Sequence, residues 1–109
     1  MMAGMEPQVG QVVTVFRSRL RADGARAYAE DATVIAALAR GMPGYVENKV
    51  FTAEDGERVN VVTFADADSH RAWRDHPEHR AAQQRGIASY YSEYSIQVGT
   101  TSYASHVRA

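Results

Sequence analysis

The 109-residue chain contains no cysteine and a single tryptophan. Neither positive nor negative charge dominates, since the formal net charge is −1. The absence of cysteine excludes disulfides, thiolate catalysis and cysteine-based zinc or iron–sulfur sites. Because acidic and basic side chains are interspersed, neither nucleic-acid binding nor an anionic membrane surface is favoured as a partner. No apolar run approaches the roughly 20 residues of a membrane-spanning helix, and residues 1–10 lack the regions of a signal peptide. We therefore expect a soluble cytoplasmic protein.

The chain also lacks the local motifs of several enzyme classes. It has no phosphate-binding loop, no dinucleotide fingerprint and no Gly-x-Ser-x-Gly nucleophile elbow. Its length allows one domain with a single core. We expect this domain to occupy residues 11–104, with loosely held tails at 1–10 and 105–109.

Hydrophobic periodicity predicts four strands and two helical regions. The strands are expected at 11–19, 45–52, 58–64 and 90–98, and the helical regions at 25–40 and 67–85. Gly41 is expected to end the first helix in a left-handed conformation, and Asp55-Gly56 predicts a hairpin turn. Pro77 disfavours helical geometry at His76 and suits the first position of a new helix, so the second helical region should break at His76.

The order β-α-β-β-α-β predicts a ferredoxin-like α+β fold, in which helices cover one face of a four-stranded antiparallel sheet. The strands carry apolar side chains on both faces, as Val12 and Val13 illustrate in the first strand. Because the helices can cover only one face, a second copy of the sheet is the simplest cover for the other. The sequence therefore predicts a homodimer.

The segment around Trp73, His76 and His79 holds the strongest candidates for catalysis. An imidazole titrates near neutral pH and can exchange protons with a phenolic substrate. The spacing of these histidines from His70 matches no metal-ligand pattern, so no metal is expected. The missing phosphate-binding loop and dinucleotide fingerprint give no sign of another cofactor, so none is expected. In the structural alternative, His76 or Asp75 caps the second helical piece and His79 lies in its first turn.

A second hypothesis is an aromatic pocket between the helices and the sheet, suited to a planar polycyclic ligand. Two polar side chains, Asn60 and Gln83, can orient such a ligand, although both can equally be solvated or structural. Trp73 can likewise be a core residue. The aromatic residues expected to line the pocket are Trp73, Phe64, Tyr90 and Tyr94.

From position 12 to position 98, the chain resembles the antibiotic biosynthesis monooxygenase domain, a member of the dimeric α+β barrel superfamily. The resemblance rests on the order of the elements and on four local motifs. These are Met42-Pro43-Gly44-Tyr45, Phe51-x4-Gly56, Trp73-x2-His76-Pro77-x-His79, and the strand containing Tyr90 and Tyr94. The resemblance implies a dimeric barrel that binds a small aromatic molecule.

Some members of that family convert aromatic polyketide phenols to quinones with dioxygen and without metal, flavin or haem. The resemblance implies that Trp73 positions the substrate and donates a hydrogen bond to a peroxy intermediate, while His76 or His79 transfers protons. The alternative is a non-catalytic ligand-binding or stress-associated dimer.

Haem-degrading relatives have an asparagine on strand one and a ligating histidine ten residues after the tryptophan. Here strand one lacks asparagine and Gln83 stands at that spacing, so haem binding is the least favoured reading.

Overall fold

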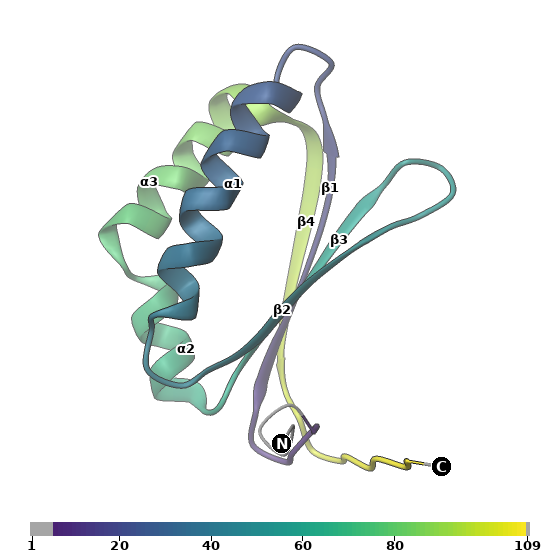
Figure 1. Cartoon of the computed structure of the whole chain (residues 1–109), viewed down its shortest axis with the longest axis vertical. Helices are drawn as coiled ribbons and strands as arrows, with labels where there is room; N and C mark the ends of the chain where they lie inside the picture. Colours follow the sequence, from purple (N-terminus) through teal and green to yellow (C-terminus); the bar gives the residue numbers. More distant parts are fainter. Residues whose placement is uncertain (1–5, 109) are drawn as a thin grey trace.

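A computed structural model describes residues 6–108 and has the predicted ferredoxin-like α+β fold (Figure 1). The strands are β1 (Val12–Leu20), β2 (Tyr45–Thr52), β3 (Arg58–Phe64) and β4 (Tyr91–Thr100). The helices are α1 (Ala25–Arg40), α2 (Ala67–Arg74) and α3 (Pro77–Arg85), followed by the short π-helix η2 (Gly86–Tyr90). Among the described residues, no helix is both long and apolar enough to cross a membrane.

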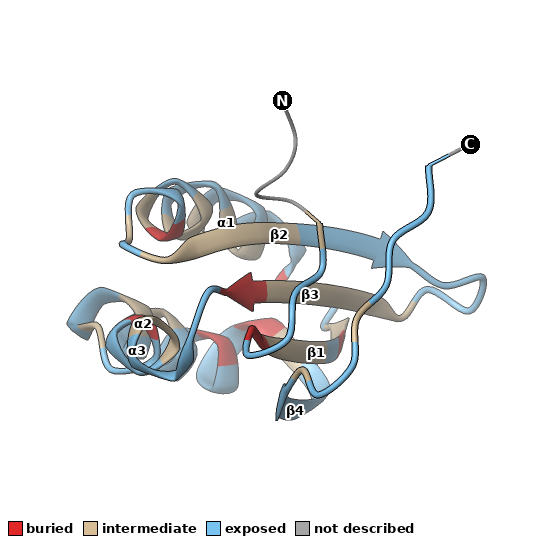
Figure 2. Ribbon diagram, turned by 90° about the horizontal axis from the view of Figure 1, so that it is seen from below, coloured by how far each residue is buried: buried red, intermediate tan, exposed pale blue. Residues whose placement is uncertain are grey.

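The four strands form one antiparallel sheet in the order β2-β3-β1-β4, and Figure 2 shows them in this order from top to bottom. At its centre, Val15 of β1 lies opposite Val61 of β3 and Gln97 of β4. The helices lie together on one face (Figure 1). No helix or strand within residues 6–108 covers the other face, which is called the open face below. The β2–β3 hairpin twists away from the helices, so one end of the sheet is less covered than the other.

The second helical region breaks at His76, as the sequence predicted. Asp66 caps α2 by accepting a hydrogen bond from the Ser69 backbone N–H at 2.8 Å, and the Ser69 side chain in turn accepts one from the backbone N–H of Asp66. His76 is extended, and α3 begins at Pro77. His76 also caps α3, because its Nδ1 accepts a hydrogen bond from the Glu78 N–H at 3.1 Å.

The turn after α1 corrects one prediction. Gly41 is not left-handed: its φ is −86°, and its N–H donates to the Leu38 carbonyl. The left-handed position is Gly44, whose φ is +81° and where an added Cβ would collide with the side chain of Ser69. The chain passes close to α2 just before β2 begins. Position 44, rather than position 41, therefore requires glycine.

The densest packing lies where α1, α2 and the Phe64 end of β3 meet. Ala39, Phe64 and Trp73 are buried together there. Five partly buried apolar residues pack against them: Ile35, Leu38, Met42, Tyr45 and Val62. Most other helix-facing residues of the sheet are only half-buried, and those of the edge strand β4 are exposed (Figure 2). The core is thus concentrated at one end of the sheet.

The start of the last strand corrects a second prediction. Tyr90 belongs to the π-helix rather than to β4, and the register between β1 and β4 shifts at Leu20. As a result, Tyr91 and Tyr94 approach Phe16 on the helix-facing side, with ring centroids 5.4 and 5.7 Å away. The sequence predicted that Tyr90 and Tyr94 share one face of the last strand. In the structure, Tyr91 and Tyr94 share that face instead.

Candidate functional site

Trp73 lies on the buried face of α2 and is only 6% exposed. Its indole stacks on Phe64 at 6.4 Å and on His79 at 4.1 Å, where the two rings are nearly parallel at 11°. The His76 ring lies 6.2 Å away on another side. The structure therefore brings Trp73, His76 and His79 together in one group, as the sequence suggested, while Trp73 also serves as a core residue.

The contact between His79 and the backbone assigns the proton on its ring. His79 Nδ1 lies 3.0 Å from the carbonyl oxygen of Trp73, and because that oxygen can only accept, Nδ1 carries the hydrogen. In the neutral ring, Nε2 is then the basic nitrogen. Burial lowers the pKa of His79, the Trp73 carbonyl opposes this shift, and the nearby His76 and His70 add to it. His79 is therefore neutral, and able to accept a proton, at pH 7.

His76 is held in the opposite tautomer. Its Nδ1 accepts the Glu78 N–H, so the hydrogen of the neutral ring lies on Nε2. Two imidazoles beside the same indole thus present different groups, a basic nitrogen from His79 and an N–H donor from His76. This complementarity depends on the break at Pro77, because the first turn of α3 supplies the Glu78 N–H and the extended His76 backbone places its ring at the helix start.

His70 completes the histidine group around Phe64. Its Nε2 lies 3.4 Å from Thr14 Oγ1 across the helix–sheet interface, and burial together with Arg74 and Arg71 lowers its pKa. Within residues 6–108, no three His, Asp or Glu side chains converge to form a metal site. The lowered pKa values keep the imidazoles of His70 and His79 neutral beside the Phe64 and Trp73 rings.

Tyr90 lies in a different aromatic group, under the start of α1. Its hydroxyl donates to Asp31 Oδ2 at 2.8 Å, and Arg85 binds the same carboxylate through two contacts of 2.9 Å. The hydrogen bonds from Arg85 lower the pKa of Asp31, and the Tyr90 hydroxyl adds to this effect, whereas burial opposes it. Burial and this hydrogen bond raise the pKa of Tyr90. Tyr28 packs edge-on against Tyr90, with ring centroids 6.0 Å apart. Tyr90 is thus tied into a structural network.

The remaining predicted residues are dispersed. Asn60 lies on the helix-facing side near the middle of β3, where its Nδ2 reaches Asn48 Oδ1 at 3.5 Å and its Oδ1 is buried without a partner. Gln83 is exposed on α3, and Tyr94 is exposed on the edge strand. Phe64 and Trp73 therefore lie at one end of the helix–sheet interface and Tyr90 and Tyr94 at the other.

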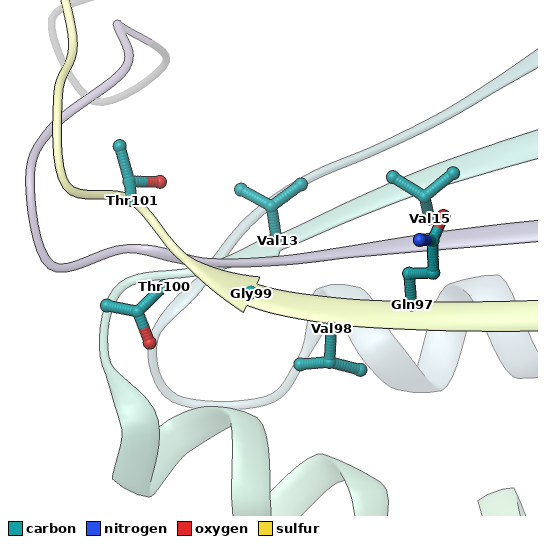
Figure 3. A pocket seen from close by; sticks show the side chains of 7 residues that line it. All are labelled: Val13, Val15, Gln97, Val98, Gly99, Thr100 and Thr101. Carbon is teal, nitrogen blue, oxygen red and sulfur yellow. The ribbon is translucent and has the colours of Figure 1, made fainter.

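Two open hollows lie away from Trp73. One, of about 460 Å³, straddles β1 and β4, where Val13 and Val15 point to the open face and Val98 points to the opposite side (Figure 3). The other, also of about 460 Å³, lies at the hairpin end of the sheet and includes Arg58 in its wall. Sequence reasoning missed Arg58 and its neighbour Ser18, although both interrupt apolar strands at helix-facing positions.

The fold and these residues define the class of protein. A family model for antibiotic biosynthesis monooxygenases matches residues 11–85, and the chain belongs to that family. The chain is 29% identical over 84 residues to the uncharacterized protein YqjZ of Bacillus subtilis (strain 168), covering 77% of this chain and 74% of YqjZ.

Solved structures share the fold at low sequence identity. SnoaB, a cofactor-independent oxygenase from Streptomyces nogalater solved in a mutant form, superposes with a TM-score of 0.73 at 18% identity, covering 86% of this chain and 95% of SnoaB. Rv0793 from Mycobacterium tuberculosis superposes with a TM-score of 0.73 at 16% identity, covering 92% of this chain and 99% of Rv0793. At these identities the likeness concerns the fold alone.

Proposed function

We propose that the protein is a cofactor-independent monooxygenase that oxidises an aromatic, phenolic substrate with dioxygen, and that it works as a homodimer in the cytoplasm. The observation that carries this proposal is the pair of histidines beside Trp73 in opposite tautomers. Oxidation of a phenol requires a base for the phenolic proton and a donor for the oxygen that becomes negative. His79 and His76 supply these two groups, and family membership supports the reaction class.

In the proposed reaction, His79 Nε2 takes a proton from the phenol and the resulting anion reduces dioxygen directly. For an anthrone, one oxygen atom becomes the new quinone carbonyl, and the other leaves as water with the two hydrogens lost from the substrate. The N–H of His76 stabilises the negative oxygen during the transfer. Once the helices move away from the sheet, Phe64 and Trp73 provide the aromatic wall at this end of the helix–sheet interface. Asn60 lies further along the same side of the sheet, where it can orient the ligand.

The open face supports the homodimer. Val13 and Val15 of β1 and Val59 and Val61 of β3 lie on it, and among the described residues no helix covers them. An apolar surface of this kind is characteristic of an interface between protein chains. A second copy packed on this face would bury these valines and complete a two-sheet core.

A non-catalytic ligand-binding dimer is the alternative, and the burial of Trp73 supports it. An indole that is 6% exposed offers little wall to a ligand unless the helices move away from the sheet. The alternative predicts binding of aromatic molecules without turnover. Oxygen consumption therefore separates the two functions.

The test is to incubate the full chain with an anthrone or a reduced naphthol under oxygen, with chelator present, and to measure quinone and oxygen consumption. The proposal expects quinone formation well above the rate in buffer. The rate should fall at least about tenfold in His79→Gln, since a positioned base contributes roughly 10²–10⁴-fold. It should also fall sharply in Trp73→Phe. Rates equal to buffer across several phenols would refute it in favour of the binding protein.

Matched variants separate chemistry from folding. His106→Gln removes an exposed histidine near the end of the chain and should leave the rate unchanged. Leu38→Ala removes an aliphatic side chain that packs against the same core and leaves every ring of the group in place, so it serves as the control for Trp73→Phe. If Leu38→Ala lowers the rate as much as Trp73→Phe, the indole acts through stability rather than by positioning the substrate.

A further inference from the structure

The hairpin end of the helix-facing side carries buried polar atoms that have no partner within residues 6–108. Ser18 is fully buried and its Oγ has no hydrogen-bond partner, and the same is true of Arg58 Nε. Ser18 and Arg58 lie directly opposite each other on β1 and β3. A third such atom, Asn60 Oδ1, lies at the next position of β3 on the same side. Buried polar atoms are normally paired, so three neighbouring exceptions show that this end of the helix–sheet interface is polar and incompletely hydrogen-bonded.

Arg58 also carries an uncompensated charge. The other arginines on the strands, Arg17 and Arg19, pair with acidic side chains at 2.9 and 2.7 Å. Among residues 6–108, no acidic side chain pairs with Arg58, whose guanidinium carbon instead lies 5.2 Å from the centre of the Tyr28 ring. A cation held beside an aromatic face without a counter-ion is suited to an anionic ligand.

The second hollow gives a ligand access to this cation. Arg58 lines it together with Leu20, Thr52 and the hairpin turn. It is an open depression of about 460 Å³ at the edge of the sheet. The Arg58 guanidinium lies over the Tyr28 ring, which in turn packs edge-on against Tyr91 at 5.9 Å.

We propose that this end of the sheet binds an aromatic carboxylate. The carboxylate pairs with the Arg58 guanidinium in the hollow, while the ring of the ligand lies against Leu20 and Thr52. Arginine suits this role because its planar group can bind both oxygens of a carboxylate at once.

This subsite is distinct from the proposed oxidation site and does not depend on it. Arg58 and Phe64 are six residues apart on β3, which corresponds to about 20 Å along an extended strand. A bicyclic acid bound in the hollow therefore does not reach Trp73. Binding of an acid that has no phenolic hydroxyl can be measured whether or not the protein oxidises phenols.

The test is isothermal titration of the full chain with 2-naphthoate, with the neutral 2-naphthamide and with inorganic phosphate. The expected result is that naphthoate binds at least tenfold more tightly than the amide and that phosphate does not displace it. Arg58→Met should abolish the preference for the acid, and Arg58→Lys should retain part of it because the charge remains.

Arg71→Met is the matched control, since Arg71 is an exposed arginine on α2 already paired with Asp68 at 2.8 Å. Its affinity for naphthoate should equal that of the wild type. Equal binding of acid and amide by the wild type, or wild-type affinity in Arg58→Met, would overturn the proposal. Displacement of naphthoate by phosphate would show a site for anions in general and overturn the aromatic assignment.

Discussion

Ser18→Ala should increase the stability of the protein, which is the reverse of the usual effect of a mutation in a buried strand. The hydroxyl of Ser18 is fully buried on β1 and lacks a partner among the described residues. An unsatisfied buried polar group costs roughly 1–3 kcal/mol, and alanine removes the group without adding volume. The lower strand propensity of alanine offsets part of this gain, since the whole propensity scale spans about 1 kcal/mol.

The net expectation is a gain of about 1 kcal/mol in the free energy of unfolding, using the middle of the range for an unsatisfied group. For a domain of about 100 residues, this corresponds to an increase of roughly 4 °C in Tm. Urea unfolding should show a higher midpoint at an unchanged m value. Protein concentration must be held constant, because dimerisation would make the midpoint depend on it.

The same substitution at Ser92 is the matched control. Ser92 is exposed on β4 and its hydroxyl donates to the Arg19 carbonyl at 3.2 Å, so alanine there removes a hydrogen bond and should lower stability slightly. Opposite signs at Ser18 and Ser92 would support the reasoning. If Ser18→Ala is destabilising by about 0.5 kcal/mol or more, the hydroxyl is satisfied in solution and the cost assigned to it here is wrong.

Two further predictions concern His79 and Gly44. Because burial lowers the folded-state pKa of His79 below its unfolded value of about 6.5, the unfolded chain binds more protons in acid, and the free energy of unfolding should fall as the pH drops below that value. Urea titrations from pH 7 to 5 should show a shallower fall in His79→Gln, and an unchanged slope would contradict the assignment. Gly44→Ala should cost more than about 1 kcal/mol, because its φ is positive and the new Cβ meets Ser69. Gly41→Ala is the control and should be nearly neutral, and equal losses at the two glycines would refute the turn assignment.

The sequence predicts the order of the elements and the break at His76 because both depend on local chemistry. Pro77 restricts the residue before it and favours the start of a helix wherever it stands, and Asp55-Gly56 favours a tight turn independently of the rest of the fold. The family resemblance has the same basis, since its motifs mark turns and helix starts. These features carried over to the structure with little change.

The lining of a pocket could not be predicted in the same way. Whether Trp73 fills the core or faces a cavity depends on the volume of the side chains around it, which spacing along the chain does not contain. The π-helix before β4 adds a second reason, because it removes Tyr90 from the strand and brings Tyr91 toward Phe16 instead. A change of one residue in register is enough to exchange the faces of a strand.

Arg58 and Ser18 left a signal that sequence reasoning could have used. In β3, the positions that face the helices are polar near the hairpin, at Arg58 and Asn60, and apolar near the other end, at Val62 and Phe64. An ordinary reading of the alternation assigns Val59 and Val61 to the core and the polar residues to solvent. The register of the sheet requires the reverse at this end, because Phe64 fixes which face packs on the helices.

This reversal of polarity along β3 connects the two proposed interactions of the sheet. Near the hairpin it places Val59 and Val61 on the open face, where a second copy of the chain can bury them. The same alternation then forces Arg58 and Asn60 under the helices, where polar atoms are costly unless a ligand pairs with them. With the ordinary pattern, the valines would lie under the helices and the polar side chains on the open face. The inverted pattern instead places apolar side chains where a second copy can bury them and polar side chains on the side of the proposed ligand. The homodimer and the carboxylate site are therefore expected to occur together in relatives that share this inverted pattern.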